Sequence, residues 1–100
     1  MTDKLNEITT YLGQEEVMLQ LSEECSELIQ ALLKYRRATK GLTPKTIEQC
    51  QIDVVEELSD VLLNIEQLLY LNDNFKDEIK NVQEYKTNRW YKRLFIKETK

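Results

Sequence analysis

Apolar residues recur at helical spacing along almost the whole chain, and few residues would interrupt a helix. Only two glycines and one proline occur among the 100 residues, and these are the two residue types that most disfavour helix interiors. Charged residues make up 32% of the chain, and the frequent Leu, Glu and Lys residues are good helix formers. The sequence therefore predicts an all-α protein, and its length fits a single domain over residues 1–100.

Four helical segments can be bracketed from apolar spacing and from capping residues. The expected helices run over residues 3–13, 14–39, 44–71 and 75–93. Thr43 is the expected N-cap of the third helix, with Pro44 at its first position. Because the connections are short, consecutive helices should pack antiparallel, as in a four-helix bundle.

Each of the two central helices should bury one apolar stripe. On the second helix we expect this stripe to consist of Val17, Leu21, Cys25, Leu28 and Leu32, widened by Met18, Ile29 and Leu33. On the third helix we expect it to consist of Ile47, Val54, Leu58, Val61, Leu62, Ile65 and Leu69. Cys25 and Cys50 fall on or near these faces and are interpreted as small core residues.

The size of the chain limits its core. A folded protein of 11.9 kDa exposes about 6,000 Å² and buries roughly 65% of its unfolded surface. That core is thin for a single chain, so we expect self-association, as a homodimer or as a tetramer built from two dimers.

Charge and composition exclude several functions. The net charge of −4 and the pI of about 4.9 disfavour binding to nucleic acid or to an anionic membrane. No apolar run approaches the roughly 20 residues that a membrane span requires. The sequence has no histidine and only two cysteines, without metal-ligand spacing, which argues against zinc and His-based sites. The expected compartment is the reducing cytoplasm.

Two pairs of carboxylates stand out on the second and third helices. Glu24 and Glu27 are three residues apart, as are Glu57 and Asp60, so each pair shares one helical face. Counting about 100° per residue places both pairs at the margin of the buried stripes. If the helices pack antiparallel, four carboxylates meet beside the core, and Ala31 leaves space next to them. Oxygen ligands of this kind favour Mg²⁺, or Mn²⁺ in its place.

The last helix offers matching positive charges. Lys86, Arg89 and Arg93 continue its apolar line, where a purely structural helix would carry apolar residues. Cations opposite an acidic seam suggest a polyphosphate bound between them. The acidic and basic helices could belong to different chains of an oligomer.

At these motifs the sequence resembles the MazG-like all-α nucleoside triphosphate pyrophosphohydrolases. The family signature is Glu-Glu-x-x-Glu on one helix and Glu-x-x-Asp on the next. The corresponding segments here are Glu23-Glu24-Cys25-Ser26-Glu27 and Glu57-Leu58-Ser59-Asp60. The segment from Lys86 to Arg93 is similar to the basic last helix common in the family. The resemblance covers about residues 14–94 and implies a MazG-like bundle completed by homo-oligomerisation.

The resemblance also implies an activity, the hydrolysis of a nucleoside triphosphate to its monophosphate and pyrophosphate. Its implied magnesium ligands and catalytic residues are Glu24, Glu27, Glu57 and Asp60. Its implied substrate-binding residues are Lys86, Arg89 and Arg93, to which we add Asn64, one turn after Asp60. One of the four carboxylates, or Glu23 beside them, would accept the proton of the attacking water.

Two other functions compete with hydrolysis. A non-catalytic helical interaction or regulatory module explains the amphipathic helices but gives the paired acids no role. A nucleic-acid binder acting through Arg36, Arg37 and the last helix is disfavoured by the net negative charge. The aromatic residues Trp90, Tyr91 and Phe95 are expected to be buried against a partner chain or the first helix.

Overall fold

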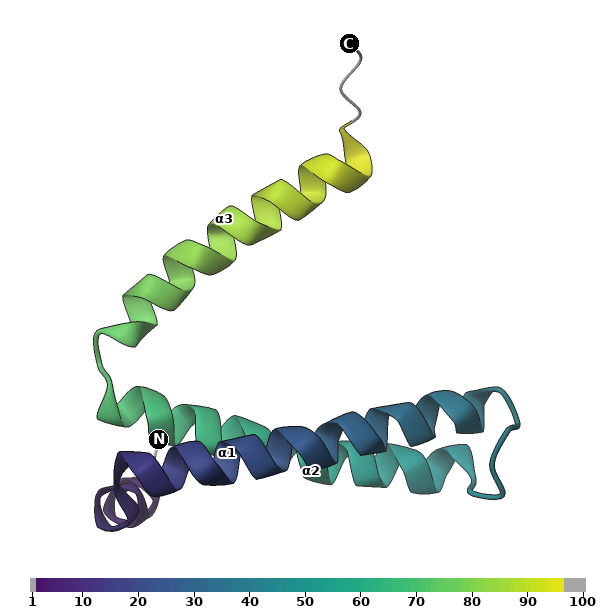
Figure 1. Cartoon of the computed structure of the whole chain (residues 1–100), viewed down its shortest axis with the longest axis horizontal. Coiled ribbons are helices and arrows are strands. Elements are labelled where there is room, and N and C mark those ends of the chain that lie inside the picture. Colours follow the sequence, from purple (N-terminus) through teal and green to yellow (C-terminus); the bar gives the residue numbers. More distant parts are fainter. Residues whose placement is uncertain (1, 97–100) are drawn as a thin grey trace.

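The computed structural model describes residues 2–96, which form three helices and no strand (Figure 1). The helices are α1 (Asp3–Thr39), α2 (Ile47–Leu71) and α3 (Phe75–Phe95). The predicted all-α class is confirmed. There are three elements in place of the expected four because the first two predicted helices join into α1. No helix within residues 2–96 is both long and apolar enough to cross a membrane.

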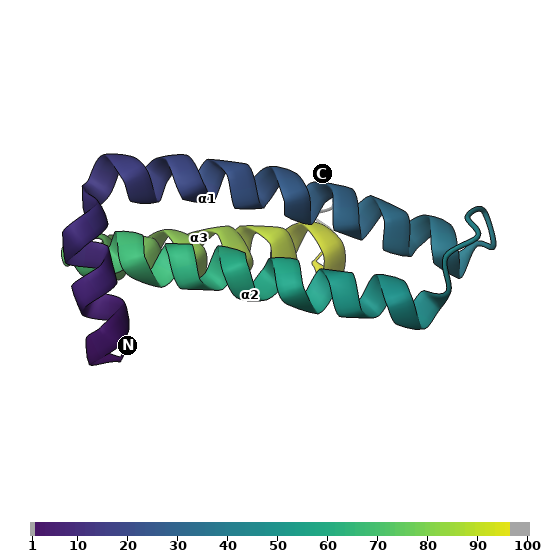
Figure 2. The ribbon, with the colours of Figure 1, turned by 90° about the horizontal axis from the view of Figure 1, so that it is seen from below.

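Helix α1 is bent at Gly13, where the first predicted helix was expected to end. Gly13 has φ 80° and ψ 170°, a left-handed backbone conformation that glycine adopts without steric cost. The segment before the bend therefore turns aside and crosses the end of α2 (Figure 2). Thr2 is the N-cap of this segment, because its hydroxyl accepts a hydrogen bond from the Leu5 N–H at 3.2 Å.

The start of α2 differs from the prediction. Its N-cap is Thr46, not Thr43, and Pro44 lies in the connection. The Thr46 hydroxyl accepts from the Gln49 N–H, and the Thr46 N–H donates to Gln49 Oε1, both at 3.1 Å. This capping box satisfies two backbone donors, whereas the Thr43 hydroxyl accepts only a long 3.4 Å bond from the Lys45 N–H. The reciprocal pair of bonds explains why the helix begins at the later threonine.

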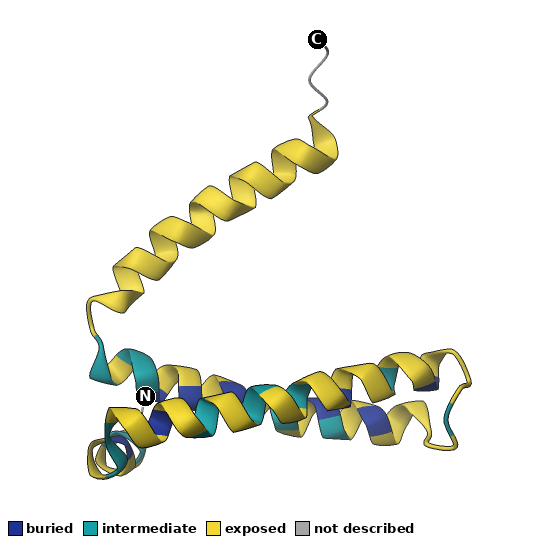
Figure 3. Cartoon of the chain, in the orientation of Figure 1, coloured by how far each residue is buried: buried dark blue, intermediate teal, exposed yellow. Residues whose placement is uncertain are grey.

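Helices α1 and α2 form an antiparallel hairpin whose buried seam follows a heptad pattern (Figures 1 and 3). On both helices, the spacing between successive buried or half-buried residues of the seam is four and three positions in turn. This spacing is expected when two helices pack side by side along their length. On α1 the seam consists of Val17, Leu21, Glu24, Leu28, Ala31, Tyr35 and Ala38. On α2 it consists of Cys50, Val54, Glu57, Val61, Asn64, Leu68 and Leu71.

The predicted stripes are therefore correct only in part. Each predicted set contains residues of the buried seam and residues of a second, exposed apolar stripe. On α2, Val54 and Val61 lie in the seam, whereas Leu62 is 57% exposed. On α1, Leu32 is 46% exposed, and Cys25 is half-buried. Cys50, on α2, is buried.

The second stripe stays uncovered on both helices. On α1 it includes Met18, Ile29 and Leu32, and on α2 it includes Val55, Leu58, Leu62 and Ile65, all of them exposed. Since residues follow one another at about 100° around a helix, both stripes lie about 100° from the seam in the same rotational sense. In an antiparallel pair this is the same side of the hairpin. We call it the apolar face, and Glu27 and Asp60 lie in the opposite rotational sense, on the other side.

Helix α3 extends away from the hairpin and has no buried residue (Figures 1 and 3). The expectation that it packs antiparallel on α2 is wrong within the single chain. Trp90 and Phe95 are 62% and 70% exposed, so they are not covered by the first helix. The chain consequently exposes 8330 Å² and has a radius of gyration of 17.9 Å, against about 13 Å for a compact chain of this length.

Candidate metal centre

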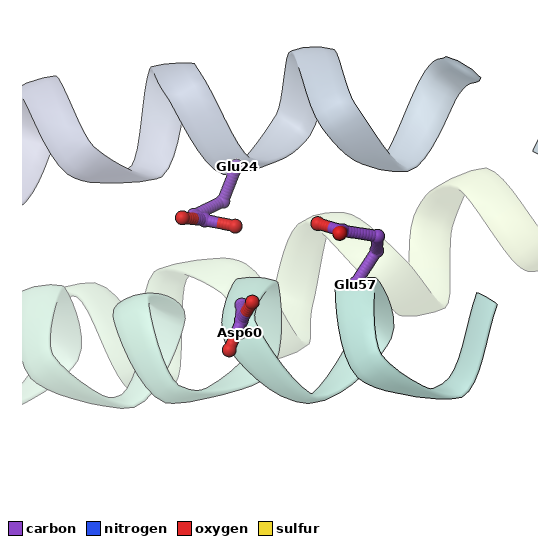
Figure 4. Close-up of side chains that lie close together, drawn as sticks. All are labelled: Glu24, Glu57 and Asp60. Atoms are coloured by element: carbon purple, nitrogen blue, oxygen red, sulfur yellow. The ribbon is translucent and has the colours of Figure 1, made fainter. Parts of the chain in front are cut away.

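Three carboxylates from the two hairpin helices converge near the middle of the seam. Glu24 extends from α1 toward α2, where Glu57 and Asp60 lie on successive turns (Figure 4). One oxygen from each of the three lies within 4.8 Å of the others. Glu24 and Glu57 are half-buried, and Asp60 is exposed. The predicted approach of the two acidic pairs is therefore found for three of the four residues.

Glu27, the fourth predicted carboxylate, lies beside this cluster on the exposed side. Its charge acts on both Glu24 and Glu57 and raises the pKa of each. The predicted position of the acids at the stripe margin holds for Glu27 and Asp60, which are exposed. It is wrong for Glu24 and Glu57, which occupy the seam itself because the heptad register runs through them.

A carboxylate in such a seam is energetically unfavourable unless something compensates its charge. Leu21 and Leu28 flank Glu24, and Val54 and Val61 flank Glu57, at the neighbouring seam positions. A helix pair selected only for stability would carry apolar residues at all of these positions. The two glutamates therefore require an explanation other than packing.

Nothing within residues 2–96 compensates these charges. Glu24 Oε2 and Glu57 Oε2 are both buried without a hydrogen-bond partner. The ion pair formed in this part of the chain joins Lys45 to Asp53 at 3.3 Å, and no basic side chain pairs with the two glutamates. Two buried, unpartnered carboxylate oxygens on facing helices fit a hard divalent cation, which takes oxygen ligands.

The crowding of the acids raises the proton affinity of Glu24 and of Glu57. Burial, followed by the charges of Glu27, Asp60 and Glu57, raises the pKa of Glu24 from its ordinary 4.5 to about 7. Burial and then the charge of Glu27 also raise the pKa of Glu57. The metal-free cluster therefore keeps a proton near neutral pH, and a cation would have to displace it.

A cavity of about 330 Å³ adjoins the cluster. It is lined by Glu27, Gln30, Ala31, Lys34, Asp53 and Glu57. The predicted space at Ala31 is thus present, because its small side chain leaves room between longer neighbours. Lys34 was not among the predicted site residues. Its place in the cavity follows from the helical register, which puts it seven residues after Glu27 on the same face.

Asn64, a predicted substrate-binding residue, lies in the seam one turn after Asp60. It is 7% exposed, and its Nδ2 donates a 2.8 Å hydrogen bond to Gln67 Oε1. Gln67 is 4% exposed and carried no sequence signal for a site. This amide pair lies on the side of the cluster away from Lys34, because α2 runs antiparallel to α1.

The three predicted cations of the last helix, Lys86, Arg89 and Arg93, lie on α3 and are exposed. Arg89 stacks over the ring of Tyr85, with its Cζ 5.5 Å from the ring centroid. Since α3 extends away from the hairpin, the single chain does not bring these cations to its own carboxylates. Their predicted role requires a second chain.

We compared the chain with protein-family models, with curated proteins and with solved structures, and none of them matches it. The resemblance to the MazG-like family accordingly rests on the motif residues themselves.

Proposed function

We propose that the protein is a magnesium-dependent enzyme that hydrolyses a nucleoside triphosphate to its monophosphate and pyrophosphate. The observation that carries this proposal is the pair of buried, unpartnered oxygens of Glu24 and Glu57, facing each other across an apolar seam. Packing of a purely structural hairpin does not require buried carboxylates, whereas a metal-dependent phosphohydrolase needs carboxylates to bind its metal. The motif resemblance supplies the reaction.

Four carboxylates would hold the metal, Mg²⁺ with Mn²⁺ as a substitute. Glu24 and Glu57 are fixed by packing in the seam, and Asp60 and Glu27 border it on the solvent side. When bound, the metal would activate a water molecule and neutralise charge on the phosphates. The adjoining cavity gives the phosphates a place beside Glu27 and Glu57, and its walls limit how they can be oriented.

The exposed surface supports assembly as a homodimer, or as a tetramer built from two dimers. The chain exposes 8330 Å², well above the about 6,000 Å² of a compact protein of its mass. Between Met18 and Leu32 on α1 and between Val55 and Ile65 on α2, the apolar face has no charged residue at its stripe positions, and it is available for a second copy. Pairing two hairpins through it would form a four-helix bundle with both acidic clusters on the outside.

Pyrophosphate release from a panel of nucleoside triphosphates tests the proposal. The wild type should release pyrophosphate with Mg²⁺ and should lose activity with a chelator. Glu57→Gln and Asp60→Asn should each lower the rate at least about 100-fold, since both remove a ligand charge from the site. Glu56→Gln is the matched control because Glu56 is an exposed neighbour on the same helix.

Loss of activity counts only if helicity and oligomer size remain those of the wild type. Activity retained in both Glu57→Gln and Asp60→Asn would contradict the metal site. No activity toward any triphosphate, together with no binding of Mg²⁺, would contradict the function itself.

The uncovered surfaces favour a second candidate, a helical interaction module without catalytic activity. Both the apolar face and the whole of α3 are exposed in the chain, as expected of a protein that acts by binding another helix. Thermal denaturation with Mg²⁺ and a non-hydrolysable nucleoside triphosphate distinguishes the two candidates. The module predicts no change in Tm, whereas the enzyme predicts an increase.

A further inference from the structure

The cavity beside the acidic cluster has a basic end that the proposed metal site does not use. Glu27 and Glu57 line it next to the cluster, and Lys34 lines it farther along α1. Lys34 follows Glu27 by seven residues, which is about 10 Å along the helix axis. Side chains on a helix lean toward its N-terminus, and for Lys34 this is the direction of Glu27 along α1.

The charge of Lys34 is available to a ligand. Asp53 lines the cavity on the α2 side, and Lys45, in the connection before α2, lies beside Asp53. Lys45 Nζ contacts Asp53 Oδ2 at 3.3 Å, so these two compensate each other. Lys34 forms no ion pair within residues 2–96, and it therefore leaves this end of the cavity positive.

We propose that Lys34 binds the terminal phosphates of the substrate, so that the polyphosphate runs from the carboxylates toward the α1–α2 connection. This inference rests on the proposed function and gives the substrate a direction. The nucleoside then lies on the other side of the cluster, toward the buried amides of Asn64 and Gln67. A cation in the same chain thus serves the phosphates, independently of the cations on α3.

The proposal is tested with inorganic tripolyphosphate, which has phosphates but no nucleoside. Its affinity is measured by calorimetry in saturating Mg²⁺ for the wild type, Lys34→Gln and Lys34→Arg. Lys34→Gln should weaken tripolyphosphate binding about tenfold, the effect of losing one charge-assisted hydrogen bond. Lys34→Arg should restore most of the affinity because it keeps the charge.

Binding of Mg²⁺ alone provides a second measurement with the opposite expectation. Removing a positive charge near the carboxylates should leave Mg²⁺ affinity unchanged or increase it. Lys4→Gln is the control for a general charge effect, because Lys4 is exposed near the start of α1. Circular dichroism verifies that all variants are folded.

The outcomes separate this inference from the proposed function. Tripolyphosphate binding that depends on Lys34, without hydrolysis of any triphosphate, supports the phosphate site and contradicts the hydrolase. Hydrolysis that survives unchanged in Lys34→Gln, with tripolyphosphate affinity within about twofold of Lys4→Gln, overturns the phosphate site only. A wild type that does not bind tripolyphosphate in Mg²⁺ also overturns it.

Discussion

Protons and divalent cations should compete for the acidic cluster, and the competition should be visible close to neutral pH. The pKa of Glu24 is about 7 in the metal-free protein because burial and the charges of Glu27, Asp60 and Glu57 favour its protonated form. A cation binds the ionised carboxylate and must first displace the proton. The affinity for Mg²⁺ should therefore rise as the pH increases through 7.

The size of the effect follows from this pKa. At pH 8 about nine-tenths of Glu24 is ionised, and at pH 6 only about one-tenth is ionised. If this one proton competes with the cation, the apparent affinity falls about tenfold between pH 8 and pH 6. The raised pKa of Glu57 adds to the fall, so tenfold is the smallest change expected.

Isothermal titration of the metal-free protein with Mg²⁺ at pH 6, 7 and 8 measures this dependence. Repeating the titration in buffers of different ionisation enthalpy counts the protons released, and we expect close to one at pH 6. The control is Glu56→Gln, since Glu56 is an exposed neighbour of Glu57 and its substitution should leave the pH dependence unchanged. An affinity that stays constant from pH 6 to pH 8, or binding that releases no proton, would refute the reasoning.

Three further predictions concern stability and assembly. Since the folded-state pKa of Glu24 lies above its unfolded value, the metal-free protein should become more stable as the pH falls from about 7 toward 4.5, and its Tm should show this. The double variant Glu24→Leu with Glu57→Leu should have a higher Tm than the metal-free wild type, because two carboxylates in the seam are replaced by apolar side chains. Mg²⁺ should no longer raise the Tm of this variant, because two of the proposed ligands are missing. Leu62→Glu should convert the proposed oligomer to monomer in light scattering without loss of helicity, since it places a charge on the apolar face. An oligomer whose mass is unchanged by this substitution would show that this face is not the interface.

Much of the secondary structure could be predicted from the sequence because its signals are local. The interruption at Gly13, where a helix was expected to end, and the end of α2 at Leu71 depend on residues within a turn or two of each boundary. The start of α2 was misplaced because two threonines compete as caps. The reciprocal bonds of Thr46 with Gln49 decide between them, and a preference for Pro44 at the first position gives no information about those bonds.

The candidate site could be predicted in composition and only partly in position. The spacing of three residues within each acidic pair indicated Glu24, Glu27, Glu57 and Asp60 as candidates. It did not indicate which of these side chains lie in the seam. Each helix has two apolar stripes about 100° apart, and periodicity alone does not show which stripe faces the partner helix. Only the burial pattern of the folded chain shows which of the two stripes faces the partner helix. The placement of Lys34 in the cavity depends on the same rotation of α1 about its axis.

The position of α3 could not be predicted from its own residues. Its line of Phe75, Ile79 and Val82 has the spacing of a packed helix, yet these residues are 36%, 40% and 50% exposed. Amphipathic spacing indicates that a helix has a partner surface, but not that this surface belongs to the same chain. The exposure of α3 therefore agrees with the expected self-association and places its cations out of reach of their own acidic cluster.

The central claim is that the acidic cluster binds a divalent cation, and a crystal structure with Mn²⁺ tests it most directly. The anomalous signal of Mn²⁺ locates the ion without any assumption about activity. We predict a peak between α1 and α2, bound by oxygens of Glu24, Glu57 and Asp60. A structure in Mn²⁺ with no peak there, and with the buried oxygens of Glu24 and Glu57 bonded to each other through a proton, would contradict the account.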